Sequence, residues 1–168
     1  MATETVRTRT RKAGHYRPQV ARTAPRRRRA VSLLSNEELR WVRPQEAIRN
    51  RQELGQFVGI SSATVGSKGI SLSTIVIPPG GRAQPHVHQV YETAIYVLQG
   101  RVQTYYGPGL TRTVINESGD FIFIPAGVPH QPVNLSQDSP AIAIVARNDP
   151  NELENVRLYD PQTRSIRE

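Results

Sequence analysis

The sequence predicts an all-β domain, folded as a closed antiparallel barrel or a two-sheet sandwich. From about residue 56 onward, short runs of Val, Ile, Thr, Tyr and Phe are separated by Gly, Pro, Asn and Asp, which are strand and turn signals. The chain has 168 residues, 37% of them hydrophobic, and no cysteine, so it can bury one core without disulfides. A basic tail and a short N-terminal helix are expected before the strands.

The tail, residues 1–30, differs in charge from the rest of the chain. It carries ten Lys or Arg against one Glu, a net charge of +9, whereas the other residues carry 12 basic and 13 acidic side chains, a net charge of −1. Few of its side chains are large and apolar, so we expect it to be disordered. It would be a solvated extension, a weak contact to nucleic acid or an anionic surface, or a transit peptide for organellar import.

Residues 31–55 are expected to form a short helical lead-in to the strands. Ser35 and Glu38 have the spacing of a capping box, which predicts a short helix that ends at Pro44. Further helical turns are expected over 45–54, before a glycine that would close them.

Residues 56–160 would form the barrel, and residues 161–168 a C-terminal tail. The run Phe121–Ile124 does not alternate with polar residues, so we expect this strand to be covered on both faces. The predicted strands lie near 56–64, 69–77, 82–89, 92–99, 101–106, 110–115, 121–124, 129–135, 141–147 and 155–159.

Three histidines within the predicted barrel are candidate metal ligands. His86 and His88 are one residue apart, so on a strand they project to the same face. Glu92 follows closely, and His130 comes after a rigid turn of Pro and Gly. Imidazole and carboxylate suit Fe, Mn, Ni, Co, Cu or Zn better than Mg or Ca. We therefore expect a divalent transition metal as cofactor (Fe, Mn, Zn or Ni), with coordination positions left for water or substrate.

Two spaced patterns in this region resemble the motifs of the cupin superfamily. The first is Gly80-x5-His86-x-His88-x3-Glu92 followed by Gly100, and the second is Gly119-x5-Pro125-x-Gly127-x2-His130-x3-Asn134. The second pattern matches the family at every position. The resemblance covers roughly residues 70–147 and is that of a single-domain cupin with both motifs.

The resemblance implies a double-stranded β-helix, or jelly-roll barrel, with a metal in its interior. It also implies that the metal is held by His86, His88, Glu92 and His130. Tyr96, near Glu92, is expected in the pocket, so Glu92 and Tyr96 are the candidate catalytic residues.

Glu92 stands one position away from the commonest family register. Seven residues separate Glu92 from Gly100, whereas the usual six would place Thr93 at that position. A shift of one residue turns a side chain to the opposite face of a strand, so Glu92 reaches the metal only if a bulge or a late strand start re-aims it. We expect Glu92 to be the fourth ligand. If it faces away, the site has three His ligands.

Fold and ligands are compatible with more than one function. The leading hypothesis is a small-molecule metalloenzyme of dioxygenase or isomerase/epimerase type, because all three histidines of the motifs are present. The alternative is a non-catalytic ligand- or metal-binding cupin, tethered to a polyanion by its basic tail.

The expected partners are a small-molecule substrate or ligand and a second copy of the chain, since exposed apolar strands favour a homodimer. No apolar run reaches the roughly 20 residues that cross a bilayer. The first thirty residues also lack the apolar core of a secretory signal, so we expect a soluble, cytoplasmic protein. Because ligating imidazoles must be neutral, metal occupancy should fall below about pH 6.

Overall fold

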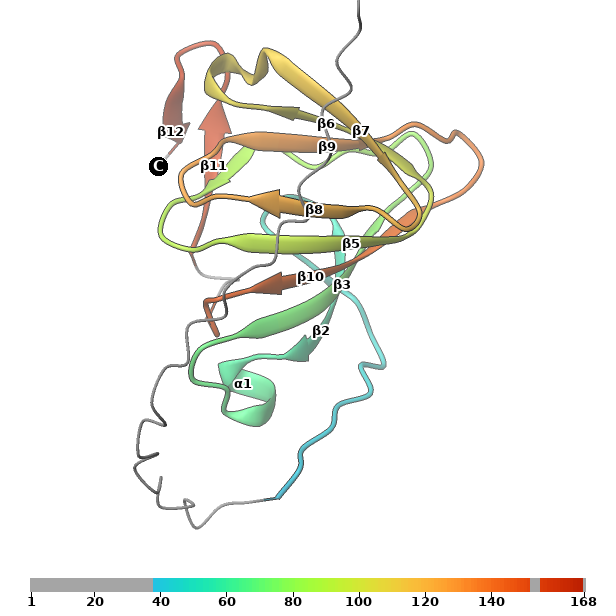
Figure 1. The fold of residues 1–168 in the computed structure, drawn as a ribbon, viewed down its shortest axis with the longest axis vertical. Coiled ribbons are helices and arrows are strands. Elements are labelled where there is room, and N and C mark those ends of the chain that lie inside the picture. The colour runs from blue at the N-terminus through green and yellow to red at the C-terminus, as the bar shows by residue number, and fades with distance from the viewer. Residues whose placement is uncertain (1–37, 152–154, 168) are drawn as a thin grey trace, which may run out of the picture. The chain divides into compact units, whose positions relative to one another are not determined.

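The computed structural model describes residues 38–151 and 155–167, and in this part of the chain almost all regular structure is β-strand (Figure 1). The short helices are α1, Ser62–Val65, and the 3-10 turn η1, Pro108–Leu110. The strands are β1 Ile48–Arg49, β2 Gly55–Ile60, β3 Ser71–Ile77, β4 His86–His88, β5 Thr93–Gln99, β6 Arg101–Tyr106, β7 Arg112–Glu117, β8 Phe121–Ile124, β9 His130–Asn134, β10 Ala141–Arg147, β11 Val156–Asp160 and β12 Ser165–Arg167.

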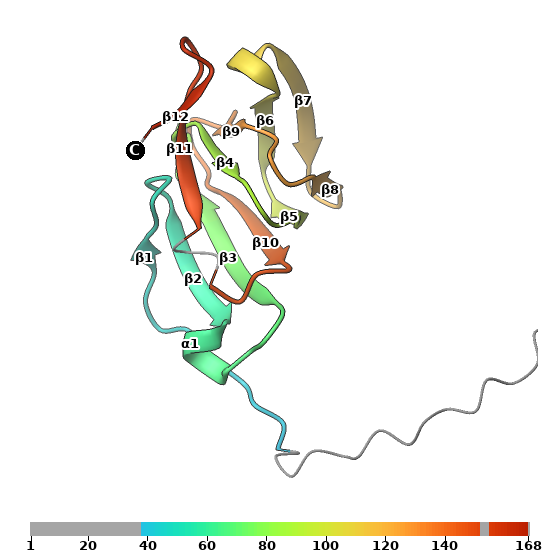
Figure 2. The same ribbon diagram turned by 90° about the vertical axis from the view of Figure 1, so that its left-hand side faces the viewer.

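Within the described residues these strands form two six-stranded antiparallel sheets, which confirms the predicted all-β class. One sheet has the order β1-β2-β3-β10-β5-β8, and the other has the order β12-β11-β4-β9-β6-β7. Figure 2 shows β1, β2, β3 and β10 side by side. Strands that follow one another in the sequence often lie in different sheets, as in a jelly roll. Both sheets contribute to the core, which contains Leu54, Ile75, Ile77, Ala83, Val102, Ala141 and Val145.

The helix α1 shortens the strand that was expected over 56–64. Ser61 Oγ accepts a hydrogen bond from the Thr64 amide at 3.1 Å, and Thr64 Oγ1 accepts one from the Ser61 amide at 2.9 Å. This pair is a capping box, which starts a helix directly after the strand. Gly66, at φ 69°, ends the helix in the left-handed conformation. The strand therefore ends at Ile60.

The structure corrects the helical lead-in that was expected over residues 31–55, since no helix lies in its described part. Asn50 Oδ1 accepts hydrogen bonds from the amides of Gln52 at 3.1 Å and Leu54 at 3.0 Å. A side chain that captures backbone amides in this way competes with helical hydrogen bonds. Glu53 completes the turn at φ 66°, outside the helical region.

Of the predictions for the two ends of the chain, the described residues test only the one for the C-terminal end. Residues 1–30 and the start of the predicted capping box at Ser35 lie outside the described residues. The expected C-terminal tail, 161–168, contains β12, which pairs with β11. Asp160 supports that hairpin, because its carboxylate accepts a hydrogen bond from the Gln162 amide at 2.8 Å. None of the described helices is long and apolar enough to cross a membrane.

Strand β8 lies at the edge of its sheet, and only one of its faces is covered by described residues. Ile122 and Ile124 face the interior, whereas Phe121 is 83% exposed and Phe123 is 62% exposed. The expectation that both faces are covered is wrong. An unbroken apolar run is typical of a strand that is covered on both faces. In β8 one apolar face points to the interior, and the other is exposed at the sheet edge.

Candidate metal centre

Three buried histidines meet in the interior, between the two sheets. His86 and His88 come from β4, and His130 lies on β9 directly opposite His86. The ring centroids are 4.2 Å apart for His86 and His130, 5.0 Å for His86 and His88, and 5.1 Å for His88 and His130. One ring nitrogen from each histidine lies within 4.8 Å of the other two. Nitrogens bound to one ion at about 2.1 Å are at most about 4.2 Å apart, so a small ring adjustment suffices.

Backbone carbonyls fix the tautomers of two of these rings. The Nδ1 atom of His86 lies 2.8 Å from the Gln84 carbonyl oxygen, and the Nδ1 atom of His130 lies 2.9 Å from the Val128 carbonyl oxygen. A carbonyl only accepts, so each Nδ1 carries the proton and donates it. Each Nε2 is left with a lone pair, and the hydrogen bond orients the ring as in metal-binding histidines.

The third ring, His88, is held by Tyr91. The Tyr91 hydroxyl lies 2.8 Å from His88 Nδ1, and the two rings stack with centroids 4.9 Å apart. The Nε2 atom of His88 is buried and has no hydrogen-bond partner among the described residues. A buried polar atom without a partner is costly, and a metal ion shared by the three rings would accept its lone pair. The three imidazoles therefore fit a divalent transition metal.

Burial keeps the three imidazoles neutral. It is the largest cause that lowers the pKa of His86 and His88 well below the usual range, and it lowers the pKa of His130 to about 4. The positive charge of Arg147 lowers each pKa further. Since metal binds the neutral ring, the free site needs no deprotonation at neutral pH.

Glu92 does not join this cluster, so the expected fourth ligand is corrected. Glu92 is exposed directly before β5, and its amide donates to Asn148 Oδ1 at 2.8 Å. Thr93 is buried and lines the interior cavity instead. The pairing of β5 with β10 is regular from Thr93 to Val97, and its register shifts only beyond Val97. No bulge therefore re-aims Glu92, and the described cluster of possible ligands consists of the three histidines.

Tyr96 also lies outside the cavity, which corrects its candidate catalytic role. Thr93, Ile95 and Val97 line the cavity, so by strand alternation Tyr96 faces the outer side of the sheet. Its ring packs there against Phe121, with centroids 4.6 Å apart. Neither candidate catalytic residue is brought to the three histidines.

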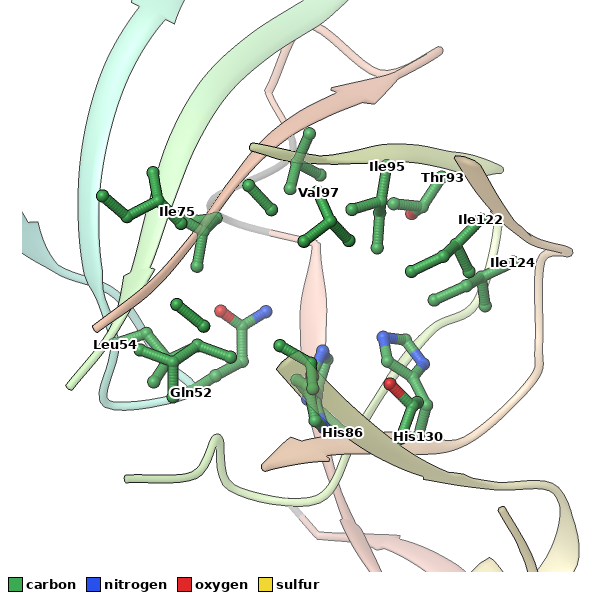
Figure 3. Close-up of a pocket in the computed structure, with 18 of the residues that line it drawn as sticks. Gln52, Leu54, Ile75, His86, Thr93, Ile95, Val97, Ile122, Ile124 and His130 are labelled. Atoms are coloured by element: carbon green, nitrogen blue, oxygen red, sulfur yellow. The ribbon is translucent and has the colours of Figure 1, made fainter. Parts of the chain in front are cut away.

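The cavity beside the histidines has a volume of about 80 Å³. His86 and His130 point into it from one sheet, while Thr93, Ile95 and Ile122 point into it from the other (Figure 3). Most of the side chains that line it are aliphatic. Among the described lining residues none is acidic. The interior is thus an apolar chamber with polar groups at a few points.

Three residues of this site were not assigned to it from the sequence. Tyr91 received no role from the sequence motifs, and its hydroxyl contacts His88. Gln52, whose amide points into the cavity, lay in the expected helical lead-in (Figure 3). Arg147 is buried at the end of β10 and lines the cavity. Alternation along the predicted strand 141–147 places Arg147 on the same face as the interior residue Val145, so that pattern was the available signal.

Two motif residues hold the turns that position the histidines. Gly127 adopts φ 78°, and its amide donates to the His88 carbonyl at 2.7 Å, which ties the turn before β9 to β4. Asn134 is buried, and its Nδ2 donates to the carbonyls of Pro78 at 3.1 Å and Ser139 at 2.8 Å. Asn134 therefore stabilises loops and does not face the metal site.

Replacing Tyr91 with phenylalanine should weaken metal binding while the fold persists, because the ring packing stays but the hydrogen bond to His88 is lost. Loss of a partner that orients a ligating histidine costs about tenfold to a hundredfold in metal affinity. Competition against a chelator of known affinity measures the change. Tyr96→Phe is the matched control and should leave the affinity unchanged, because Tyr96 faces away from the site.

The sequence of this chain is similar to those of known proteins. Residues 73–147 match the family model of the Cupin domain. The chain is 30% identical over 96 residues to Germin-like protein 12-2 of Oryza sativa subsp. japonica, a match that covers 53% of this chain and 42% of the relative. The chain thus spans about two fifths of the length of this curated relative.

Solved structures of other proteins have a fold similar to that of this chain. A protein with a double-stranded β-helix domain from Klebsiella pneumoniae superposes with a TM-score of 0.52, at 21% identity over 71% of this chain and 90% of that chain. Oxalate decarboxylase of Bacillus subtilis, which has Mn(II) centres, superposes with a TM-score of 0.55, at 20% identity over 64% of this chain and 28% of that chain. At these identities the likeness shows the double-stranded β-helix fold.

Proposed function

The chain belongs to the cupin superfamily through its residues 73–147, and on that premise we propose that it is a metal-dependent enzyme acting on a small molecule inside the barrel. The observation that carries the proposal is the orphaned Nε2 atom of His88, buried beside His86 and His130 with one nitrogen of each ring within 4.8 Å. A histidine kept only for packing would have both ring nitrogens satisfied.

The three histidines would hold the ion, and the rest of the barrel would set its surroundings. Fe, Mn, Zn and Ni all suit imidazole ligands, and Mn is the metal of the structurally similar Bacillus decarboxylase. When bound, the ion would supply a Lewis acid or, if it is Fe or Mn, a centre for oxygen chemistry. The aliphatic walls exclude water, which strengthens the polar interactions that a substrate makes inside.

Between the two expected reaction types, the lining favours a dioxygenase. Isomerases and epimerases move a proton by means of a side-chain acid or base. Among the described residues that line the cavity, the histidines are the groups that ordinarily titrate near neutrality, and they are committed to the ion. Oxygen chemistry on a bound substrate does not depend on such a base.

Elemental analysis of protein purified without chelators is the first test of the proposal. We expect about one transition-metal ion per chain, because three neutral ligands meet at one point. Oxygen uptake and isomerisation are then measured with a panel of keto acids and sugars. Protein that carries no metal, and takes up none from a solution of Fe, Mn, Zn or Ni salts, would contradict the proposal.

A second candidate function is a cupin that binds a ligand or a metal without catalysis. It is favoured by the exposed position of Glu92, since the site then lacks the carboxylate that the family motif would provide. Metal-loaded protein that binds small molecules but shows neither oxygen uptake nor isomerisation with them would support this candidate over the enzyme.

We propose a homodimer that forms through the outer face of β8 and β5. Phe121 and Phe123 are exposed there beside Tyr96, and aromatic side chains are typical anchors of interfaces. Phe121→Ser should weaken dimerisation about thirtyfold, as measured by sedimentation velocity, because an anchor costs about 2 kcal/mol. Ile166→Ser, an exposed position in the other sheet, is the control. A wild-type protein that stays monomeric at high concentration would contradict this proposal.

The cytoplasmic location and the polyanion contact through residues 1–30 remain predictions, because those residues lie outside the described part of the chain. Deletion of residues 1–30 tests both. We expect the deletion to remove salt-dependent binding to a model polyanion such as heparin, since each neutralised phosphate or sulfate contributes to it. Unchanged polyanion affinity and unchanged location would rule out a role for the tail.

A further inference from the structure

We propose that Gln52 and Thr104 form a substrate-binding pair beside the histidines, and that the substrate is a small uncharged aliphatic molecule with two oxygens, such as a hydroxyketone. The inference concerns the contacts that hold this molecule in the cavity. It rests on the proposed function for the reaction, which would take place at the histidine site.

The Gln52 side chain enters the cavity from a loop that hydrogen bonds hold in place. Asn50 Oδ1 accepts a hydrogen bond from the Gln52 backbone amide at 3.1 Å, and the Gln52 carbonyl accepts one from the Gln84 amide at 3.0 Å. The Gln84 carbonyl in turn accepts the hydrogen bond from His86 Nδ1 at 2.8 Å. Gln52 and His86 are therefore anchored to the same residue, which fixes the position of one relative to the other.

The side-chain amide of Gln52 has no hydrogen-bond partner among the described residues, because the bonds that Gln52 makes to them use its backbone. Gln52 is nevertheless only 4% exposed. Figure 3 shows its amide pointing into the cavity that it lines with the histidines. A buried amide with two N–H donors and one carbonyl acceptor is costly to leave unpaired. A ligand oxygen beside Gln52 would provide the missing partner.

Thr104 supplies a second uncharged group to the same cavity, from the sheet that carries the histidines. Thr104 on β6 pairs directly with Pro132 on β9, two residues after His130. Directly paired residues, and residues two apart on one strand, project from the same face of a sheet. All three residues accordingly line the cavity. Thr104 is 7% exposed, and its hydroxyl has no hydrogen-bond partner among the described residues.

The two polar groups lie on either side of the paired rings of His86 and His130. Strands β4, β9 and β6 are neighbours in their sheet, so Thr104 on β6 lies beyond His130. Gln52 is bonded to the segment that leads into β4, and Figure 3 shows Gln52, His86 and His130 in this order along one side of the cavity. A ligand that contacts both groups would therefore lie across the histidines.

The walls and the polar groups together define the class of the molecule. Most walls are aliphatic and favour an alkyl body, and a cavity of about 80 Å³ limits that body to a few carbon atoms. Amide and hydroxyl groups both donate and accept, whereas a carboxylate is best matched by a charged donor. Arg147 also lines the cavity, but it already has an interaction of its own. A short hydroxyketone therefore fits better than an organic acid.

Titration of the full chain with 3-hydroxy-2-butanone, followed by heteronuclear NMR, tests the ligand class. Metal-free protein and protein loaded with diamagnetic Zn²⁺ are both used. The comparison ligands are 2-butanone, which lacks the hydroxyl, and lactate, in which a carboxylate replaces the methyl ketone. In the metal-free protein we expect 2-butanone to bind about threefold to tenfold more weakly than the hydroxyketone, because one hydrogen bond is lost. Lactate should bind at least about tenfold more weakly, because its charge is buried without a charged partner.

Three results would overturn the ligand class. The first is equal affinity of the metal-free protein for the hydroxyketone and 2-butanone. The second is tighter binding of lactate than of the hydroxyketone to the metal-free protein. The third is no binding of the hydroxyketone to either form of the protein.

Substitutions then assign the contacts. Gln52→Leu and Thr104→Val each remove a hydrogen-bonding group but keep most of the bulk, so each should weaken binding of the hydroxyketone about threefold to tenfold. The side-chain amide signals of Gln52, identified by their absence in Gln52→Leu, should shift when the ligand is added. Gln99→Leu and Thr113→Val, at exposed positions, are the matched controls and should bind as the wild type does. If Gln52→Leu loses its fold by circular dichroism, Thr104→Val, which keeps nearly the same shape, decides the matter.

Metal content separates this inference from the proposed function. Neither variant should lose metal, and loss of metal from Gln52→Leu in the absence of ligand would make Gln52 a metal ligand and refute the pair. If the chain takes up no metal but binds the hydroxyketone in a way that both variants weaken, the pair is supported and the metalloenzyme proposal fails. If metal binds but wild type and both variants have the same affinity for the hydroxyketone, the pair is refuted and the metal site stands.

Discussion

Replacing His88 with alanine should abolish metal binding while leaving the two sheets folded. The variant removes the ring whose Nε2 atom is buried without a partner, and two neutral imidazoles hold a divalent ion far more weakly than three. Removing a partner that only orients a ligand costs about tenfold to a hundredfold, so loss of the ligand itself should cost more than about a hundredfold in affinity. Elemental analysis after dialysis checks this result.

Glu92→Gln is the informative control for that experiment. Glu92 is exposed and lies outside the three-His cluster, so this variant should bind metal as the wild type does. If Glu92→Gln lost metal to the same extent as His88→Ala, Glu92 would be a ligand and the register of β5 would be different from the one described. Global unfolding of His88→Ala in the circular dichroism spectrum would instead show that the core depends on the ion.

Acid should destabilise the metal-free protein steeply between about pH 6.5 and pH 4. Burial lowers the pKa of all three histidines in the folded state, for His130 to about 4, whereas the unfolded chain has ordinary values near 6.5. Below about pH 6.5 the unfolded state therefore binds more protons than the folded state, so the free energy of unfolding falls as pH falls. Three such groups give a slope of about 4 kcal/mol per pH unit near pH 5.

Urea denaturation at several pH values, in the presence of a chelator, measures that slope. In His88→Ala the slope should decrease to about 3 kcal/mol per pH unit, because one of the three proton-binding groups is gone. A free energy of unfolding that stays constant from pH 6.5 to pH 5 would contradict the neutral state of the buried rings.

The same shift changes the expected pH range of metal binding. From the sequence, occupancy was expected to fall below about pH 6, near the ordinary pKa of histidine. Since burial holds the pKa of these rings lower, the folded site competes less with protons, and occupancy should persist toward pH 4, where His130 titrates. This change comes from the surroundings of the side chains and cannot be obtained from residue types.

The strand-rich part of the fold could be predicted from the sequence because its strand and turn signals are strong. The strands at 101–106, 121–124 and 141–147 have the bounds that turn residues and β-branched runs predict. The structure of the segment 31–55 could not be predicted, because the side chain of Asn50 binds backbone amides that a helix would use. Such competition between a side chain and the backbone is not visible in a pattern of apolar residues.

The candidate metal ligands were also predictable from the sequence only in part. The alternation of a strand was enough to place His86 and His88 on one face, and the second motif was enough to bring His130 to them. Whether Glu92 or Thr93 faces inward depended on where β5 begins, which its pairing with β10 determines. A register is a property of two strands together, so neither segment alone contains it.

By itself, therefore, the sequence determined the all-β class, most strand positions and the three histidines, because each depends on spacing along one strand or on turn chemistry. The tertiary structure alone decided that the three histidines form a cluster without Glu92 and that Tyr91 holds one of their rings. It also decided that Arg147 pairs directly with Ser71 on one neighbouring strand and with Thr93 on the other. The physical reason is that burial, register and hydrogen-bond partners arise between segments far apart in the chain, where only packing brings them together.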